Sequence, residues 1–223
     1  MRICVVGLGK IGLPLAVQYA GKGHQVVGVD VQQTVVEQVN AATEPFPGET
    51  DLAARLAAAV SAGRLRATSS HAEGVAGADA VVMVVPIYVD EQTGQPDYGW
   101  MDAATRAVAA ALRPGVLVAY ETTLPVGTTR GRWKPMIEEA SGLVDGQDLD
   151  VVFSPERVLT GIADACGVSG TWVPPRASAQ TLSDRVARFG TTLVHGGEDG
   201  EKTWVSVPLA HRPAEARNDG GAG

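Results

Sequence analysis

The first 160 or so residues alternate between short apolar runs and longer segments in which apolar residues recur every three or four positions. Apolar runs closed by glycine or proline predict buried strands, and the three-to-four spacing predicts amphipathic helices. We therefore expect strands at residues 2–7, 25–30, 78–86, 116–122 and 149–155. We expect helices at residues 11–23, 33–42, 51–63, 101–115 and 129–142, with Pro135 breaking or kinking the last helix.

Strands that alternate with helices predict an α/β fold, in which right-handed crossovers build a doubly wound parallel sheet covered on both faces. Residues 1–161 carry this pattern and form the first expected domain. Residues 162–196 read as a strand–helix–strand unit that would complete the sheet, with the second strand at 191–197. Residues 197–223 are rich in glycine, proline and charge, which predicts a loose or disordered tail.

Three glycines, Gly7, Gly9 and Gly12, follow the first strand in the spacing GxGxxG and lead into the first helix. Asp30 ends the second strand, where its carboxylate can accept hydrogen bonds from a ribose diol. This context indicates a Rossmann-type domain that binds a dinucleotide, with the pyrophosphate at the helix N-terminus. Val31 follows Asp30 with no adjacent arginine for a 2′-phosphate, so NAD is expected over NADP. The alternative is a domain of this fold that has lost its ligand.

Three further loops follow buried strands, at residues 84–91, 121–130 and 154–161. Each carries polar groups beside proline or glycine, which taken singly is ordinary turn chemistry. Because the carboxyl ends of parallel strands meet at one edge of the sheet, we expect the three loops to form a rim on the cofactor side.

Composition narrows the partners and the compartment. A formal net charge of −7 argues against a nucleic acid or an anionic membrane as the main partner. The expectation is a cytoplasmic protein, because the sequence has no signal-peptide pattern and no apolar run long enough to span a membrane. No metal site is predicted. Of the two cysteines, Cys4 lies within an apolar strand and is expected to be a buried, inert thiol.

Five motifs in order, "GLGKIGLPLA", "GVD", "VP…DE", "ETTLPVGTT" and "SPERV", resemble the UDP-sugar 6-dehydrogenase family, which includes UDP-glucose and UDP-N-acetylmannosamine dehydrogenases. The likeness runs from residue 1 to about 161. It implies an NAD-dependent, two-step oxidation of the sugar C6 alcohol to the uronic acid, through a cysteine-bound thioester. The motifs at 85–91 and 121–130 look nearer to the UDP-N-acetylmannosamine branch than to the UDP-glucose branch.

The resemblance assigns roles to residues of this sequence. Thr123 would lie beside the nicotinamide and orient a water, and Glu156 would act in the acid–base and hydrolysis steps. For Glu156, a salt bridge with Arg157 or a loop hydrogen bond is the alternative. The residues expected to contact the cofactor are Gly7, Gly9, Lys10, Ile11, Gly12, Asp30, Val85, Pro86, Glu121, Thr122 and Thr123.

Several positions depart from the family pattern. Lys10 replaces an aromatic residue, Ile87 replaces a threonine, and Val35 replaces a basic residue on the adenosine side. The family's lysine-bearing central helix and its nucleophile loop have no counterpart here. Lys202 is followed closely by proline, and Cys166 lacks the flanking glycines and proline of that loop.

Three hypotheses therefore stay open for this chain. It is a UDP-sugar dehydrogenase, a catalytically inactive NAD-binding domain, or a dimerisation module that regulates relatives. A homo-oligomer is compatible with each. For the sequence beyond residue 161, a frameshifted or truncated gene and a short natural form are both retained.

Overall fold

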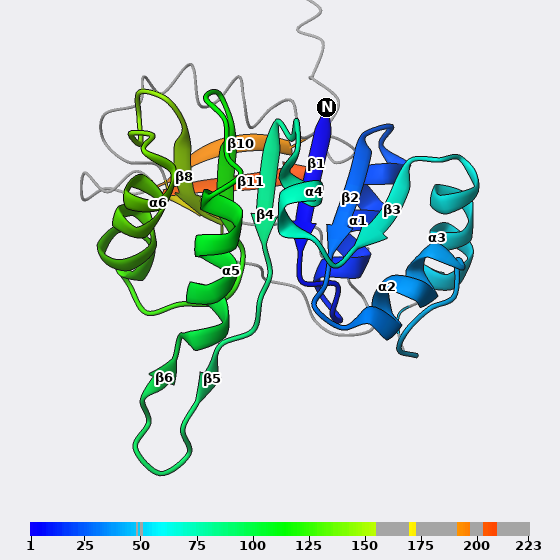
Figure 1. The fold of residues 1–223 in the computed structure, drawn as a ribbon, viewed down its shortest axis with the longest axis horizontal. Helices are drawn as coiled ribbons and strands as arrows, with labels where there is room; N and C mark the ends of the chain where they lie inside the picture. Colours follow the sequence, from blue (N-terminus) through cyan, green and yellow to red (C-terminus); the bar gives the residue numbers. More distant parts are fainter. Residues whose placement is uncertain (48, 50, 155–169, 173–190, 197–202, 209–223) are drawn as a thin grey trace, which may run out of the picture.

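The structure is a computed structural model of the 223-residue chain, and it describes residues 1–47, 49, 51–154, 170–172, 191–196 and 203–208. Six parallel strands form a continuous part of one sheet, from its edge strand β3 inward, in the order β3-β2-β1-β4-β7-β8 (Figure 1). Their bounds are Arg2–Val6 (β1), Gln25–Val29 (β2), Leu65–Thr68 (β3), Ala80–Met83 (β4), Leu117–Tyr120 (β7) and Asp150–Phe153 (β8). The expected doubly wound α/β fold is confirmed.

Helices cover both faces of this sheet. One face packs against α1 (Gly12–Gly21), α2 (Gln33–Asn40) and α3 (Leu52–Ser61), and the other against α4 (His71–Val75), α5 (Gly99–Ala109) and α6 (Lys134–Ser141). Strand β1 shows why the sequence pattern is apolar without interruption. Ile3 and Val5 belong to the first core and Cys4 and Val6 to the second, because successive side chains point to opposite faces.

Some short elements were not expected from the sequence. These are β3, α4, and a hairpin of β5 (Tyr88–Val89) and β6 (Pro96–Asp97) that extends away from the body of the molecule (Figure 1). Helix α4 and the hairpin strands are too short to display a period, and β3 is interrupted by the exposed Arg66. Helix α5 also begins earlier than expected, at Gly99, whose backbone N–H donates to the Asp97 carboxylate at 2.8 Å.

The helix expected at residues 129–142 is broken near Pro135, as the sequence predicts. A π-helical turn, η1 (Thr129–Trp133), precedes α6, and Pro135 occupies the first turn of α6. Proline has no N–H to donate, and the first turn of a helix is the place where none is needed.

Three antiparallel strands extend the sheet beyond β8, in the order β9 (Gly170–Trp172), β11 (Thr203–Pro208) and β10 (Thr191–Gly196). The strand expected at 191–197 corresponds to β10. Strand β11 lies inside the segment for which composition predicts a loose tail, whereas the helix expected between β9 and β10 lies outside the described residues. The division of the chain into domains stays a prediction. Among the described residues, no helix is both long and apolar enough to cross a membrane.

Candidate functional site

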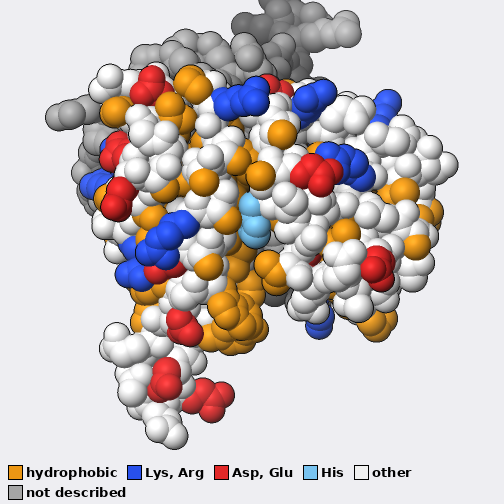
Figure 2. All heavy atoms as spheres, in the orientation of Figure 1, with side chains coloured by type: hydrophobic (Ala, Val, Ile, Leu, Met, Phe, Trp, Pro, Cys, Tyr) orange, Lys and Arg blue, Asp and Glu red, His pale blue; other side chains and the backbone are white. Residues whose placement is uncertain are grey.

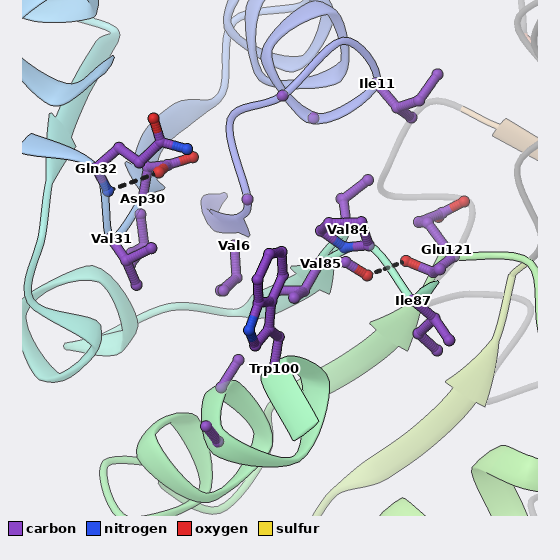
Figure 3. A pocket seen from close by; sticks show the side chains of 18 of the residues that line it. Val6, Ile11, Asp30, Val31, Gln32, Val84, Val85, Ile87, Trp100 and Glu121 are labelled. Carbon is purple, nitrogen blue, oxygen red and sulfur yellow. Dashed lines mark hydrogen bonds between the residues drawn. The ribbon is translucent and has the colours of Figure 1, made fainter. Parts of the chain in front are cut away.

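A cleft of about 1200 Å³ opens at the edge of the sheet where β1, β2, β4 and β7 end (Figure 3). Pockets for drug-sized ligands measure roughly 300–1,000 Å³. The cleft is slightly larger than that range, as a dinucleotide requires. The cleft is lined by Val6, Gly7, Gly9, Lys10, Ile11, Gly12, Val29, Asp30, Val31, Gln32, His71, Val84, Val85, Pro86, Ile87, Tyr88, Trp100, Ala103, Ala104, Ala107, Glu121, Thr122 and Thr123.

The three glycines at the start of the cleft are required for three different reasons. Gly7 has φ +95°, and a Cβ there would lie 2.9 Å from the Val84 carbonyl oxygen. A Cβ on Gly12 would lie 1.7 Å from the Gly7 carbonyl oxygen, so the turn closes only without a side chain. A Cβ on Gly9 would meet no protein atom within 4 Å. Gly9 therefore leaves space on the ligand side of the turn, where first-turn N–H groups of α1 suit a phosphate.

Asp30 is held by backbone N–H groups of two different turns, the one after β1 and the one after β2. Its carboxylate accepts the N–H of Leu8 at 2.9 Å through one oxygen and the N–H of Gln32 at 2.9 Å through the other. Each carboxylate oxygen has a second acceptor position, so the fixed group can still accept from a ribose diol. None of the described residues that line the cleft is an arginine, so this end lacks the usual partner of a 2′-phosphate.

The loops after β4 and β7 are joined at the opposite end of the cleft. The Thr122 hydroxyl donates to the Val85 carbonyl oxygen at 2.8 Å. Glu121 is 4% exposed, whereas Thr123 is exposed to the cleft. Burial raises the pKa of the Tyr19 hydroxyl, and the nearby Glu121 carboxylate raises it further.

Helix α5 anchors the segment that follows the 121–130 loop. Asp102 on α5 is 7% exposed and accepts from the Arg132 guanidinium at 2.8 and 2.5 Å and from the Trp133 indole at 2.9 Å. The Arg132 bond is the main reason why the pKa of Asp102 lies below its usual value. The Trp133 ring also stacks on Tyr120 of β7, so the buried carboxylate ties the end of this loop to the core.

The structure brings together every sequence-predicted cofactor residue. The eleven residues named above for cofactor contact all line the cleft, although their individual contacts with a ligand stay predictions. Ile87 also lines it, while Val35 is half-buried on α2 and does not. Glu156, Cys166 and Lys202 lie outside the described residues.

Sequence reasoning missed the part of the cleft wall that α5 and α4 supply. Trp100, Ala103, Ala104 and Ala107 line the cleft at the helical spacing i, i+3, i+4 and i+7, and His71 joins them from α4. This spacing could have been recognised in the sequence, because residues at i, i+3, i+4 and i+7 share one face of a helix.

Cys4 is the inert thiol that the sequence predicts. Its side chain is fully buried among the residues that face α4 and α5, and this burial raises the pKa of the thiol to about 12. Among the described residues, no group of three or more histidine, cysteine or acidic side chains is placed to hold a metal ion.

A glycine turn at a helix N-terminus, an acid at the end of β2 and a cleft over the switch in strand order together define a dinucleotide-binding domain of the dehydrogenase class. Comparison with known proteins specifies the family. Residues 1–166 match the NAD binding domain of the UDP-glucose/GDP-mannose dehydrogenase family, and the chain belongs to that family. Its cofactor is NAD.

Individual relatives agree with this assignment. The chain is 36% identical over 163 residues to the UDP-N-acetyl-D-mannosamine dehydrogenase of Pyrococcus horikoshii and 39% identical over 166 residues to an NDP-N-acetyl-D-galactosaminuronic acid dehydrogenase of Ralstonia nicotianae. These matches cover 72% and 71% of this chain but 37% and 38% of the relatives.

Solved structures show the same fold. A ternary complex of GDP-mannose dehydrogenase from Pseudomonas aeruginosa superposes with a TM-score of 0.77 at 26% identity, over 84% of this chain and 44% of that one. The P. horikoshii enzyme superposes with a TM-score of 0.68 at 35% identity, over 72% of this chain and 37% of that one. This chain thus spans between 37% and 44% of the length of these relatives.

Proposed function

We propose that this chain supplies the NAD-binding half of a UDP-sugar 6-dehydrogenase, with UDP-N-acetylmannosamine favoured over UDP-glucose as the sugar nucleotide. The observation that carries the proposal is that the 7–12 glycine turn, Asp30 and the 121–123 loop line one continuous cleft. The relatives named as UDP-N-acetyl-D-mannosamine dehydrogenases support the choice of substrate.

The residues present fit NAD at each position of the cleft. Gly9 leaves room that we assign to the pyrophosphate, and Asp30 has acceptor positions that we assign to the ribose. Thr122 and Thr123 line the cleft, and we propose that the nicotinamide lies beside them. Bound NAD accepts a hydride from the sugar carbon. Thr123 is proposed to orient a water there, and Glu156 to move the protons, as the family resemblance implies.

A second candidate is an NAD-binding module that does not turn over sugar by itself. Thioester formation needs a reactive cysteine, and within the described residues the one cysteine is Cys4, which is buried. Cys166 lies outside those residues and lacks the sequence surroundings of the family's nucleophile. A partner subunit would then supply the thiol, and this chain would act through NAD binding or dimerisation.

The two candidates separate in one set of measurements on the purified 223-residue chain. NADH and NADPH are titrated first, followed by assays of UDP-N-acetylmannosamine and UDP-glucose oxidation with and without a full-length relative. We expect NADH to bind more tightly than NADPH and turnover to be low in the chain alone.

The alternatives give distinct results. Absence of NADH binding would refute both candidates. Formation of two NADH per sugar by the chain alone, lost in Cys166→Ala, would establish an autonomous enzyme and exclude the module. The size of the particle in solution, with and without NADH, tests the expected homo-oligomer.

A further inference from the structure

The cleft wall near Asp30 carries large apolar side chains that the glycine motif does not explain. Trp100 is 59% exposed and Val31 is 79% exposed, although both line the cleft. In Figure 3 the indole of Trp100 rises from the first turn of α5 between Val31 on one side and Val85 on the other. Apolar surface of this kind is costly to leave in water, which is why it commonly marks a binding site.

The indole of Trp100 is held in a defined plane. The Tyr88 ring, at the base of the β5–β6 hairpin, makes an edge-to-face contact with it, with ring centroids 4.9 Å apart and an interplanar angle of 86°. Figure 2 shows hydrophobic side chains gathered where this hairpin meets the body of the molecule. Edge-to-face geometry is favourable for aromatic pairs, so the contact restrains Trp100 before any ligand arrives.

The side chains beside Trp100 suit an uncharged nucleobase better than a phosphate. His71 also lines the cleft, and burial lowers the pKa of its imidazole, which favours the uncharged form. Together with Val31 and Trp100 it gives a neutral, largely apolar surface. An aromatic heterocycle matches that surface, because its flat faces make few hydrogen bonds to water and so have a small desolvation cost.

The position of this surface identifies the ligand group. With the pyrophosphate at the 7–12 turn and the nicotinamide at residues 121–123, the ribose at Asp30 belongs to the adenosine half of NAD. We propose that Trp100 stacks against the adenine of NAD, with Val31 as the opposite wall, and that it sets affinity for the adenosine half. This inference rests on the NAD binding proposed above.

Fragments of the cofactor test this role. ADP-ribose contains the adenine and nicotinamide mononucleotide does not, and each is titrated into the full chain while tryptophan fluorescence is followed. We expect ADP-ribose alone to quench, and the quench to disappear in Trp100→Phe, which keeps a ring for packing. Trp100→Ala should weaken ADP-ribose binding roughly 5- to 20-fold, the lower part of the range for base–aromatic stacking.

The matched control is Val89→Ala. Val89 is 60% exposed beside Tyr88 but does not line the cleft, so its substitution should leave ADP-ribose affinity unchanged. Thermal melts show whether each variant is folded. If Trp100→Ala does not fold, the fluorescence quench of Trp100→Phe on addition of ADP-ribose tests the role of Trp100.

The outcomes separate this inference from the proposed function. A wild-type chain that binds neither NADH nor ADP-ribose would refute both. A chain that binds both, with unchanged affinity in Trp100→Ala or with a full quench in Trp100→Phe, would refute the role of Trp100 and leave NAD binding intact.

Discussion

Two glycines in the same turn should respond to the same substitution in opposite ways. In Gly12→Ala the new Cβ would lie 1.7 Å from the Gly7 carbonyl oxygen and 2.9 Å from its carbon, both backbone atoms. The turn between β1 and α1 can relieve this overlap only by opening. We expect a loss of about 3 kcal/mol in the free energy of unfolding, the upper part of the range for overpacking. In a chain of this size that lowers the melting temperature by about 6–12 °C.

Gly9→Ala should leave the fold intact and damage binding. Its Cβ would have no protein atom within 4 Å, and Gly9 is not among the residues with positive φ. The free energy of unfolding should stay level or rise by about 0.4–1 kcal/mol, because alanine restricts the unfolded chain. The methyl would occupy the space assigned to the pyrophosphate. NADH affinity should then fall roughly tenfold, the effect of losing about one charge-assisted hydrogen bond.

Thermal melts and NADH titrations of both variants provide the assay, and Gly21→Ala is the matched control. Gly21 also has open space around its Cβ position and lies on α1, but it does not line the cleft. A stable Gly12→Ala variant would refute the packing argument. A Gly9→Ala variant with wild-type NADH affinity would refute the placement of the phosphates.

Three further predictions concern single side chains. Asp30→Ala should weaken NADH binding and lower the melting temperature, since the carboxylate accepts two backbone N–H groups; unchanged NADH affinity in a titration would contradict its ribose role. Cys4 should resist alkylation until the chain is unfolded, because its thiol is buried with a pKa of about 12; peptide mass mapping after labelling checks this. Asp102→Asn should cost roughly 1.5–3 kcal/mol at pH 7, as expected for a lost hydrogen bond to a charged group. The lowered folded-state pKa of Asp102 means that its contribution is present above the usual aspartate pKa and is lost as the pH falls through the lowered value. The melting temperatures of wild type and Asp102→Asn should therefore differ at pH 5 and converge only as the pH falls below the usual aspartate pKa of about 3.9.

Much of the fold could be predicted because its signals are local. The parallel strands expected from the sequence are short apolar runs, and β1 shows the physical cause, since a strand with helices on both faces needs apolar side chains on both. Strand β3 was missed because the exposed Arg66 interrupts it, so it does not form a continuous apolar run as β4 and β7 do. Helix α4 has five residues, too few to show a period.

The candidate site divides in the same way. The cofactor residues that were predicted lie in motifs immediately after strands, and the parallel sheet gathers them at one edge. Trp100 and His71 come from segments with no motif, and they reach the cleft only because α5 and α4 pack on the sheet beside it. The link between Asp102 and Arg132 was equally invisible, since it joins two segments 30 positions apart in the chain.

By itself the sequence determined the order of the longer helices and of the apolar strands, the glycine turn and the acid at the end of β2, because each depends on neighbouring residues along the chain. Only the tertiary structure decided what surrounds them. Gly7 is needed partly because the Val84 carbonyl closes against it, and Trp100 becomes part of a cofactor cleft because α5 brings it opposite Val31. These are distances between segments remote in sequence, and they are set by how the crossovers pack.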